Sequence, residues 1–428
     1  MADTGERAAG ELHKTLSVTR GIGVAVSMVV GSGLLVLPGL TFTQFGDAAV
    51  FAWIAAAVVM LPLLLVFARL GAHFPNAGGV IGFLRAGFGR AGAGPIAYVL
   101  LGATAFGGAA MALTGANYVA SLLGSANWAL PAAAVYLIVV GVLNAQGAQL
   151  ASGLQTAVTA VLVLLIALVA VVPFAAPGYE PEGAVALPSD PLALVPAIGL
   201  VFFAFTGWEL VASTTEEYRN PRRDLPIVVG ASFLIMIVLY VGVAAAVQVS
   251  LDPEDPLTGT APVVAVLGRV LGGSAGVAAG LLGALIIFAT LMGGTWATSR
   301  IVFATARERL LPLAAARVNP ANGAPVPAIL VAVLMFGGVV LGYGAGLLTL
   351  DQVFRLSSVN FLVGYILSAL AYGAVFRAWW QRALAVLAAL PALAVLAGFG
   401  PLLVFPAVLL AAGAVAHRVT ARRAEPAG

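Results

Sequence analysis

Cysteine is absent from this chain of 428 residues, and charged residues make up only 9% of it. Without cysteine the chain forms no disulfide bond and no thiolate metal site. The three histidines, His13, His73 and His417, lie far apart in the sequence and lack the spacing of metal ligands. The formal net charge of +3 gives no support to nucleic-acid binding.

Apolar residues dominate instead, because 61% of the chain is hydrophobic and apolar runs recur along its length. A run of about 18 residues or more crosses the bilayer core as a helix. A soluble protein of this size could not bury so much apolar surface in one core. The pattern predicts an all-α integral membrane protein without a soluble module. Twelve transmembrane helices are expected, at 18–43, 48–70, 95–123, 128–145, 151–175, 192–216, 227–250, 273–299, 325–346, 350–375, 382–398 and 400–417.

The positions of the basic residues predict the orientation of these spans. If both termini are cytoplasmic, all of the 20 Lys and Arg residues except Arg269 and Arg355 fall on the cytoplasmic side. This bias is the positive-inside rule. We therefore expect cytoplasmic tails at 1–17 and 418–428. The first 17 residues are polar, which predicts that no signal peptide is cleaved from them.

Two of the expected spans contain residues that weaken a helix. The first span holds Val29-Val30-Gly31-Ser32-Gly33, and the sixth holds Phe203-Ala204-Phe205-Thr206-Gly207. A glycine inside a helix costs about 1 kcal/mol relative to alanine. The two breaks lie at similar distances from opposite ends of spans that run in opposite directions. Glycines in membrane helices also allow close packing alone, but paired interruptions are typical of inverted repeats with a solute site at the breaks. The repeats are expected at 18–175 and 192–375, followed by two further helices at 382–417.

The chemistry of the two breaks favours an amino acid. A helix break exposes N–H groups on one side and carbonyl groups on the other. We expect the N–H groups of Ser32 and Gly33, together with the Ser32 hydroxyl, to hold a carboxylate. The carbonyls near Val29 and from Phe203 to Thr206 would receive an ammonium group. No tightly bound cofactor is implied.

Glu209 is the one charged side chain that falls within an apolar span rather than in a loop or at a helix end. An ionisable group at bilayer depth is costly and indicates a functional site. Burial favours its neutral form, whereas the helix dipole favours its ionised form. Two interpretations remain open, a residue that couples transport to protons and a protonated structural acid.

Several segments resemble the amino acid–polyamine–organocation (APC) superfamily, and the resemblance runs along nearly the whole chain. It rests on Gly31–Gly33, Leu70–Gly79, Phe205–Glu209, Glu216–Pro226 and Ser299–Pro312. The resemblance implies a LeuT-like fold, which is an inverted repeat of five plus five helices with broken helices 1 and 6, here with two extra helices. It also implies a transporter rather than an enzyme, with substrate backbone contacts at Val29, Ser32, Gly33, Phe203 and Thr206.

Within this superfamily the chain is most similar to the bacterial exporters of methionine and branched-chain amino acids. The similar segments are Gly21–Gly23, His73–Val80 and Leu154–Thr156. This similarity implies efflux across the bacterial inner membrane, with uptake as the alternative. The chain departs from many sodium-independent relatives near Val163, because the fifth span has no lysine to replace a sodium ion.

The substrate side chain is expected to meet an apolar pocket. Apart from Glu209, no charge lies at mid-membrane depth, so a neutral and apolar amino acid is predicted. Methionine side chains adapt to varied apolar groups, although each candidate also fits ordinary helix packing. The candidates, besides Phe203, are Met28, Phe106, Met111, Trp208 and Met292.

The sequence gives little support to two other functions, a membrane enzyme and a channel. A membrane enzyme would need clustered acids, bases or metal ligands, and a channel would need a filter motif or rings of charge. Neither pattern is present in the sequence. Ion pairs of Arg20 or Arg300 with Glu216 or Glu217 would suit a cytoplasmic gate, but interfacial charges are usually solvated anchors.

Overall fold

The computed structural model describes residues 17–74, 80–147, 152–181, 183–208, 211, 215, 218 and 220–424. All regular elements in this part of the chain are helices, joined by loops, and none is a strand. The α-helices are α1 (Val18–Val29), α2 (Leu37–Phe45), α3 (Ala49–His73), α4 (Val80–Leu122), α5 (Ala129–Ala145), α6 (Ser152–Ala175), α7 (Leu194–Val201), α9 (Pro221–Ser250), α10 (Pro256–Thr260), α11 (Pro262–Leu271), α12 (Gly273–Arg307), α13 (Val326–Gly344), α14 (Leu350–Val375), α15 (Trp379–Ala397) and α16 (Val404–Ala424). Short 3₁₀ turns include η1 (Ser32–Leu35) and η5 (Phe202–Phe205).

Ten helical segments of the described chain are long and apolar enough to cross a membrane, so this is a multi-pass membrane protein. These ten segments match the second to fifth and the seventh to twelfth expected spans. Of the remaining two expected spans, the first breaks into α1 and α2, and the described part of the sixth breaks after η5. The predicted all-α fold with broken helices 1 and 6 is therefore confirmed.

The first break lies between α1 and α2. The helix α1 ends at Val29, and Gly31 is fully extended (φ −115°, ψ −176°) before η1 begins. The second break follows α7 and η5, where Thr206 is extended (ψ 166°) and Gly207 has a positive φ of 110°. A positive φ is readily adopted only by glycine, which explains why Gly207 stands at this turn.

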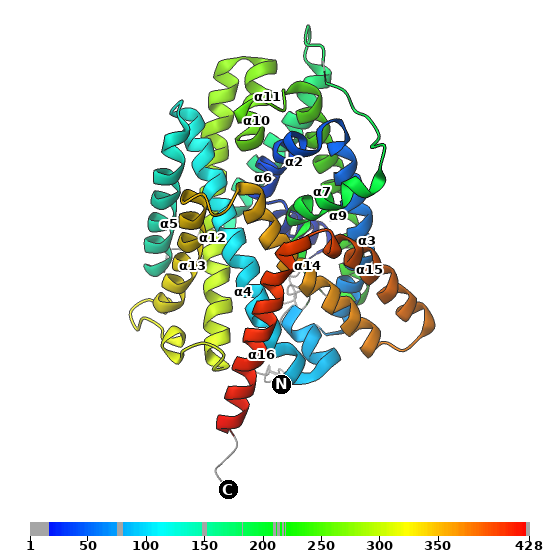
Figure 1. Ribbon diagram of the computed structural model, residues 1–428, viewed down its shortest axis with the longest axis vertical. Coiled ribbons are helices and arrows are strands. Elements are labelled where there is room, and N and C mark those ends of the chain that lie inside the picture. Colours follow the sequence, from blue (N-terminus) through cyan, green and yellow to red (C-terminus); the bar gives the residue numbers. More distant parts are fainter. Residues whose placement is uncertain are drawn as a thin grey trace, which may run out of the picture.

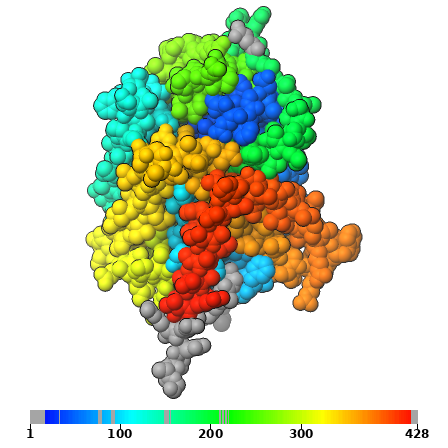
Figure 2. Space-filling view, in the orientation of Figure 1, coloured from blue at the N-terminus to red at the C-terminus, as the bar shows by residue number. Residues whose placement is uncertain are grey.

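The helix α4 lies at the centre of the bundle and packs against α12, α13, α14 and α16. Figure 1 shows α4 passing behind α16, and the space-filling view in Figure 2 shows α16 lying along the front face of the molecule. The helix α4 also kinks at Gly89 (φ 72°), which separates a short first part from the membrane span that follows. This short part, like α10 and α11, was not expected as a separate element.

The two ends of the molecule are distinguished by the helices that end there. The helix α12 begins beside α11 and runs to Arg307, where Arg85 of α4 forms an ion pair with Glu308 at 2.8 Å. The C-terminal end of α5 reaches the same end, because Asn322 in the loop before α13 donates a hydrogen bond to the Ala145 carbonyl. These are called the α11 end and the Arg307 end below (Figure 1).

Candidate substrate site at two helix breaks

The two helix breaks touch each other. A Cβ atom placed on Gly33 would lie 2.9 Å from Cδ1 of Phe203, and one placed on Gly207 would lie 2.8 Å from the carbonyl oxygen of Met28. Contacts below about 3 Å leave no room for a side chain at either glycine. The glycines therefore allow the interrupted parts of the first and sixth spans to approach closely.

Tyr240 of α9 hydrogen-bonds to both breaks. Its hydroxyl lies 2.9 Å from the Ala204 carbonyl oxygen and 3.3 Å from the Val29 carbonyl oxygen, so a single O–H group is shared between the two spans. The side chain is fully buried, and its ring packs edge-on against Trp53 at 5.7 Å. Sequence reasoning missed this residue. The available signal was a tyrosine inside an apolar span, where its hydroxyl needs a partner.

A second buried tyrosine fixes the part of the first span that follows the break. Tyr118 of α4 donates a 2.7 Å hydrogen bond to the Leu35 carbonyl, at the end of η1. The central helix α4 is thereby joined to η1. Sequence reasoning missed Tyr118 as well, and for the same reason.

The breaks present hydrogen-bond donors on one side and acceptors on the other, as the carboxylate and ammonium groups of an amino acid require. Ser32 and Gly33 are the first residues of η1, so their N–H groups have no acceptor within that turn. On the other side, the Phe203 carbonyl accepts from the N–H and the hydroxyl of Thr206, at 3.2 and 2.8 Å. Each carbonyl oxygen has two lone pairs, so Thr206 occupies both acceptor positions of the Phe203 carbonyl, and an ammonium group would have to displace one of these bonds to bind there. The Ser32 hydroxyl lies outside the described side chains.

The apolar candidates divide into two groups. Phe203 packs edge-on against Phe354 of α14 with ring centroids 5.1 Å apart. A Cβ on Gly107 of α4 would lie 3.4 Å from the same ring. Met111 lies one turn further along α4, where its sulfur faces Gly294 of α12. Met28 adjoins Gly207 through its carbonyl. Phe203 and Met28 thus lie at the breaks, and Met111 lies between α4 and α12 one turn from the residue that contacts Phe203.

The other three candidates contact different surroundings. The Phe106 ring packs against Phe405 of α16 at 5.1 Å, and the Met292 sulfur lies 3.6 Å from the Asn144 amide of α5. Trp208 is buried against Phe233 of α9 and lines a cavity of about 10 Å³ between α3 and α9. That volume is at most about one water molecule. No acceptor for the Trp208 Nε1 group lies among the described residues.

The charged candidates are placed as follows. Glu209, Glu216 and Glu217 lie outside the described residues. Arg20 is exposed on the first turn of α1. Arg300 stacks on the Trp296 ring of its own helix at 4.6 Å and lines a cavity beside α5.

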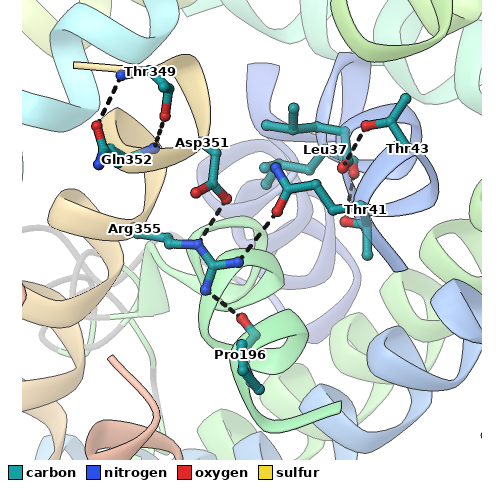
Figure 3. A network of polar contacts seen from close by, with 10 residues as sticks. Leu37, Thr41, Thr43, Pro196, Thr349, Asp351, Gln352 and Arg355 are labelled. Carbon is teal, nitrogen blue, oxygen red and sulfur yellow. Dashed lines mark hydrogen bonds and ion pairs between the residues drawn. The ribbon is translucent and has the colours of Figure 1, made fainter. Parts of the chain in front are cut away.

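A polar cluster near the α11 end joins α2, α7 and α14 (Figure 3). The helices α2 and α7 adjoin the two breaks, and α14 is the tenth span. Arg355 of α14 forms an ion pair with Asp351 at 2.7 Å and donates a 2.6 Å hydrogen bond to the Pro196 carbonyl of α7. A third, longer bond of 3.4 Å reaches Gln44 of α2. Sequence reasoning placed Arg355 on the outer side but assigned it no partner, although Asp351 and Arg355 have the i, i+4 spacing of a helical ion pair.

Two interrupted helices facing each other within a bundle of membrane-spanning helices define a transporter of the LeuT fold. The fold is shared with the crystal structure of MhsT in complex with L-phenylalanine, with a TM-score of 0.59 over 91% of this chain and 99% of that one, at 15% sequence identity.

The chain belongs to the amino acid permease family of the APC superfamily, because the profile of that family matches residues 16–423. It is 27% identical over 420 residues to the amino acid permease YecA of Bacillus subtilis, covering 94% of this chain and 95% of YecA. It is 25% identical over 307 residues to the L-methionine/branched-chain amino acid exporter YjeH of Escherichia coli, covering 69% of this chain and 71% of YjeH. The protein is thus an amino acid transporter and not an enzyme.

Proposed function

We propose that this protein is a secondary transporter of neutral, apolar L-amino acids that works by alternating access. The observation that carries the proposal is the contact between the two breaks, where Gly33 adjoins the Phe203 ring and Gly207 adjoins the Met28 carbonyl. The N–H groups would bind the α-carboxylate, and the carbonyls of Val29 and of Phe203 to Thr206 would bind the α-ammonium group. The extended backbone at Val30–Gly31 and at Thr206, together with Phe205 at the end of η5 and Gly207, would supply the backbone of this site.

The substrate class follows from the side chains around the breaks. Phe203 and Met111 are apolar, and Met28 packs against the apolar core. Two comparisons point the same way, since YjeH is named as an exporter of methionine and branched-chain amino acids and MhsT was crystallised with L-phenylalanine. The substrates are therefore methionine, leucine, isoleucine and valine.

Efflux is the proposed direction, across a bacterial inner membrane with both termini in the cytoplasm. The Arg307 end, which carries Arg85, Arg307 and Arg317, would then be cytoplasmic, as the positive-inside rule expects. Residues 18–175 and 192–375 form the two inverted repeats, and 382–417 the two added helices. The first proposed repeat would contain α1 to α6, and the second would contain the helices from α7 to α14.

Coupling to protons is proposed through Glu209. The only lysine of the chain is Lys14, so no lysine of α6 supplies a fixed charge near Val163 in place of sodium. Glu209 is the acid that lies next to the Gly207 turn, whereas Glu216 stands at the end of the sixth span. Its protonation would change the charge beside the site once in each cycle.

The test is flux of labelled methionine and leucine by reconstituted protein, with and without a pH gradient. Saturable flux is expected, and Gly33→Val should abolish it, because the added side chain would collide with Phe203. Gly23→Val is the matched control, since a Cβ on Gly23 meets nothing within 4 Å. Glu209→Gln should transport without responding to the pH gradient. Flux that survives Gly33→Val would overturn the assigned site, and accumulation in the opposite direction would favour uptake.

A further inference from the structure

A polar cavity of about 130 Å³ lies between α5, α12 and the loop before α13. None of its lining residues belongs to the two helix breaks. Its walls are formed by Asn144 and Gly147 at the end of α5, Trp296 and Arg300 of α12, and the loop residues 322–324. A single water needs only about 10–15 Å³ on this measure. The cavity therefore has room for a group of several heavy atoms.

Arg300 brings a positive charge to this cavity. A guanidinium has five N–H donors, and Arg300 uses one of them on Ser299 Oγ at 3.2 Å while its plane lies over the Trp296 ring. Within the described ranges of the chain, no Asp or Glu forms an ion pair with Arg300. The cavity thus combines a cation, spare donors and an aromatic wall, which suits an anion.

The depth of Arg300 in the membrane narrows the choice of anion. The helix α12 has 35 residues, or about 53 Å of helix, against a hydrocarbon core of about 30 Å. Its ends must project on both sides. Arg300 is seven residues before the last residue of α12, about 10 Å from the Arg307 end, which is the level of lipid headgroups. Trp296 is 40% exposed, as expected for an aromatic residue at a membrane interface.

Exposed apolar side chains are also present on α5 and α13, the two helices on either side of the cavity loop. Ile138 and Val142 of α5 are 62% and 50% exposed, and Leu330 and Leu334 of α13 are 56% and 64% exposed. Such surfaces would contact acyl chains in a bilayer. A free anion would use only the polar cavity, whereas a lipid would use both surfaces.

We propose that this cavity is a binding site for the phosphate of an anionic phospholipid, with Arg300 as its charged ligand. Arg binds phosphate oxygens through parallel N–H bonds, and basic pockets between membrane helices bind anionic headgroups. A lipid held here would bridge α5, α12 and α13. The site is separate from the proposed substrate site and does not depend on it.

The test is native mass spectrometry of delipidated protein titrated with phosphatidylglycerol or phosphatidylcholine. The wild type is expected to retain at least one phosphatidylglycerol in preference to phosphatidylcholine, and Arg300→Gln should weaken that binding about tenfold or more. Arg317→Gln is the matched control, because it removes the same charge from an exposed residue near the same end of the molecule. Equal phosphatidylglycerol retention by the wild type and Arg300→Gln would overturn the proposal.

A second variant keeps the test decisive if Arg300→Gln does not fold. Asn322→Asp places a negative charge in the lining of the cavity and keeps the oxygen that accepts from the Ala324 N–H, but it loses the bond to the Ala145 carbonyl, so its melting temperature is measured beside its lipid binding. It should lose phosphatidylglycerol as Arg300→Gln does, and unchanged retention would count against the site. A further experiment uses inorganic phosphate to distinguish a free anion from a lipid headgroup. If phosphate raises the melting temperature of the wild type but not of Arg300→Gln, and phosphatidylglycerol shows no preference, a free anion and not a lipid is the ligand.

Discussion

Tyr240 joins the two interrupted spans through one hydroxyl group. Its partners, the carbonyls of Val29 and Ala204, lie at the ends of the segments that would bind the substrate ammonium group. Because one proton serves two acceptors, the hydroxyl sets the distance between the breaks without saturating either carbonyl. Tyr240 is therefore a positioning residue for the proposed transport.

We expect Tyr240→Phe to keep the ring packing against Trp53 and Phe205 but to loosen the alignment of the breaks. Hydrogen bonds between membrane helices contribute about 0.6–2 kcal/mol, so kcat/KM for methionine should fall about 3- to 30-fold. Transport kinetics in proteoliposomes measure this, with the melting temperature as a check of folding. A melting temperature that falls while kcat/KM is unchanged would mean that Tyr240 is only structural.

At the scale of elements, the Arg355 cluster holds α14, α7 and α2 together near the α11 end. The Arg355 side chain is only 11% exposed and that of Asp351 20%, so the ion pair is largely buried. Removing one partner of a buried pair costs about 3–5 kcal/mol. Because α2 and α7 each adjoin a break, we expect the cluster to limit how far the first and sixth spans separate at this end.

Arg355→Gln should therefore open the α11 end more often. The chain has no cysteine, so a single Cys at Thr41, which is fully buried on α2, reports access. Maleimide labelling of Thr41→Cys is expected to be several-fold faster with Arg355→Gln. Arg269→Gln, which removes an exposed charge from α11, should leave the rate unchanged. Equal rates in all three backgrounds would exclude Arg355 as a closing contact.

At the scale of the whole molecule, the fold could be predicted from the sequence because apolar length and helix-weakening residues are local properties. The breaks fall at Val30–Gly31 and Thr206–Gly207, where glycine marks them. The face that a helix turns toward a neighbouring helix is set by tertiary packing and is not a local property of the sequence. Phe106 and Met292 have the same apolar character as Met111, yet only their contacts show that they face α16 and α5. The contacts of Tyr240 with Val29 and Ala204, and of Arg355 with Pro196, could not be predicted because these partners are backbone carbonyls, which leave no mark in a sequence.

The orientation of the whole molecule gives a prediction of its own. Glu180 and Ala321 are exposed loop residues, expected outside the cell and in the cytoplasm respectively. A Cys at position 180 should react with an impermeant maleimide in intact cells, whereas a Cys at 321 should react only after lysis. The reverse pattern would invert the proposed topology and, with it, the assignment of the Arg307 end.

The ring of Phe203 has a consequence for how the transporter loads. It touches the surroundings of Gly33, Gly107 and Phe354, and so occupies space beside the ends of both breaks. The phenyl group thus fills space that the side chain of a substrate would need. Loading then exchanges one apolar group for another, and we expect selectivity to follow the difference in volume between the substrate side chain and the displaced ring.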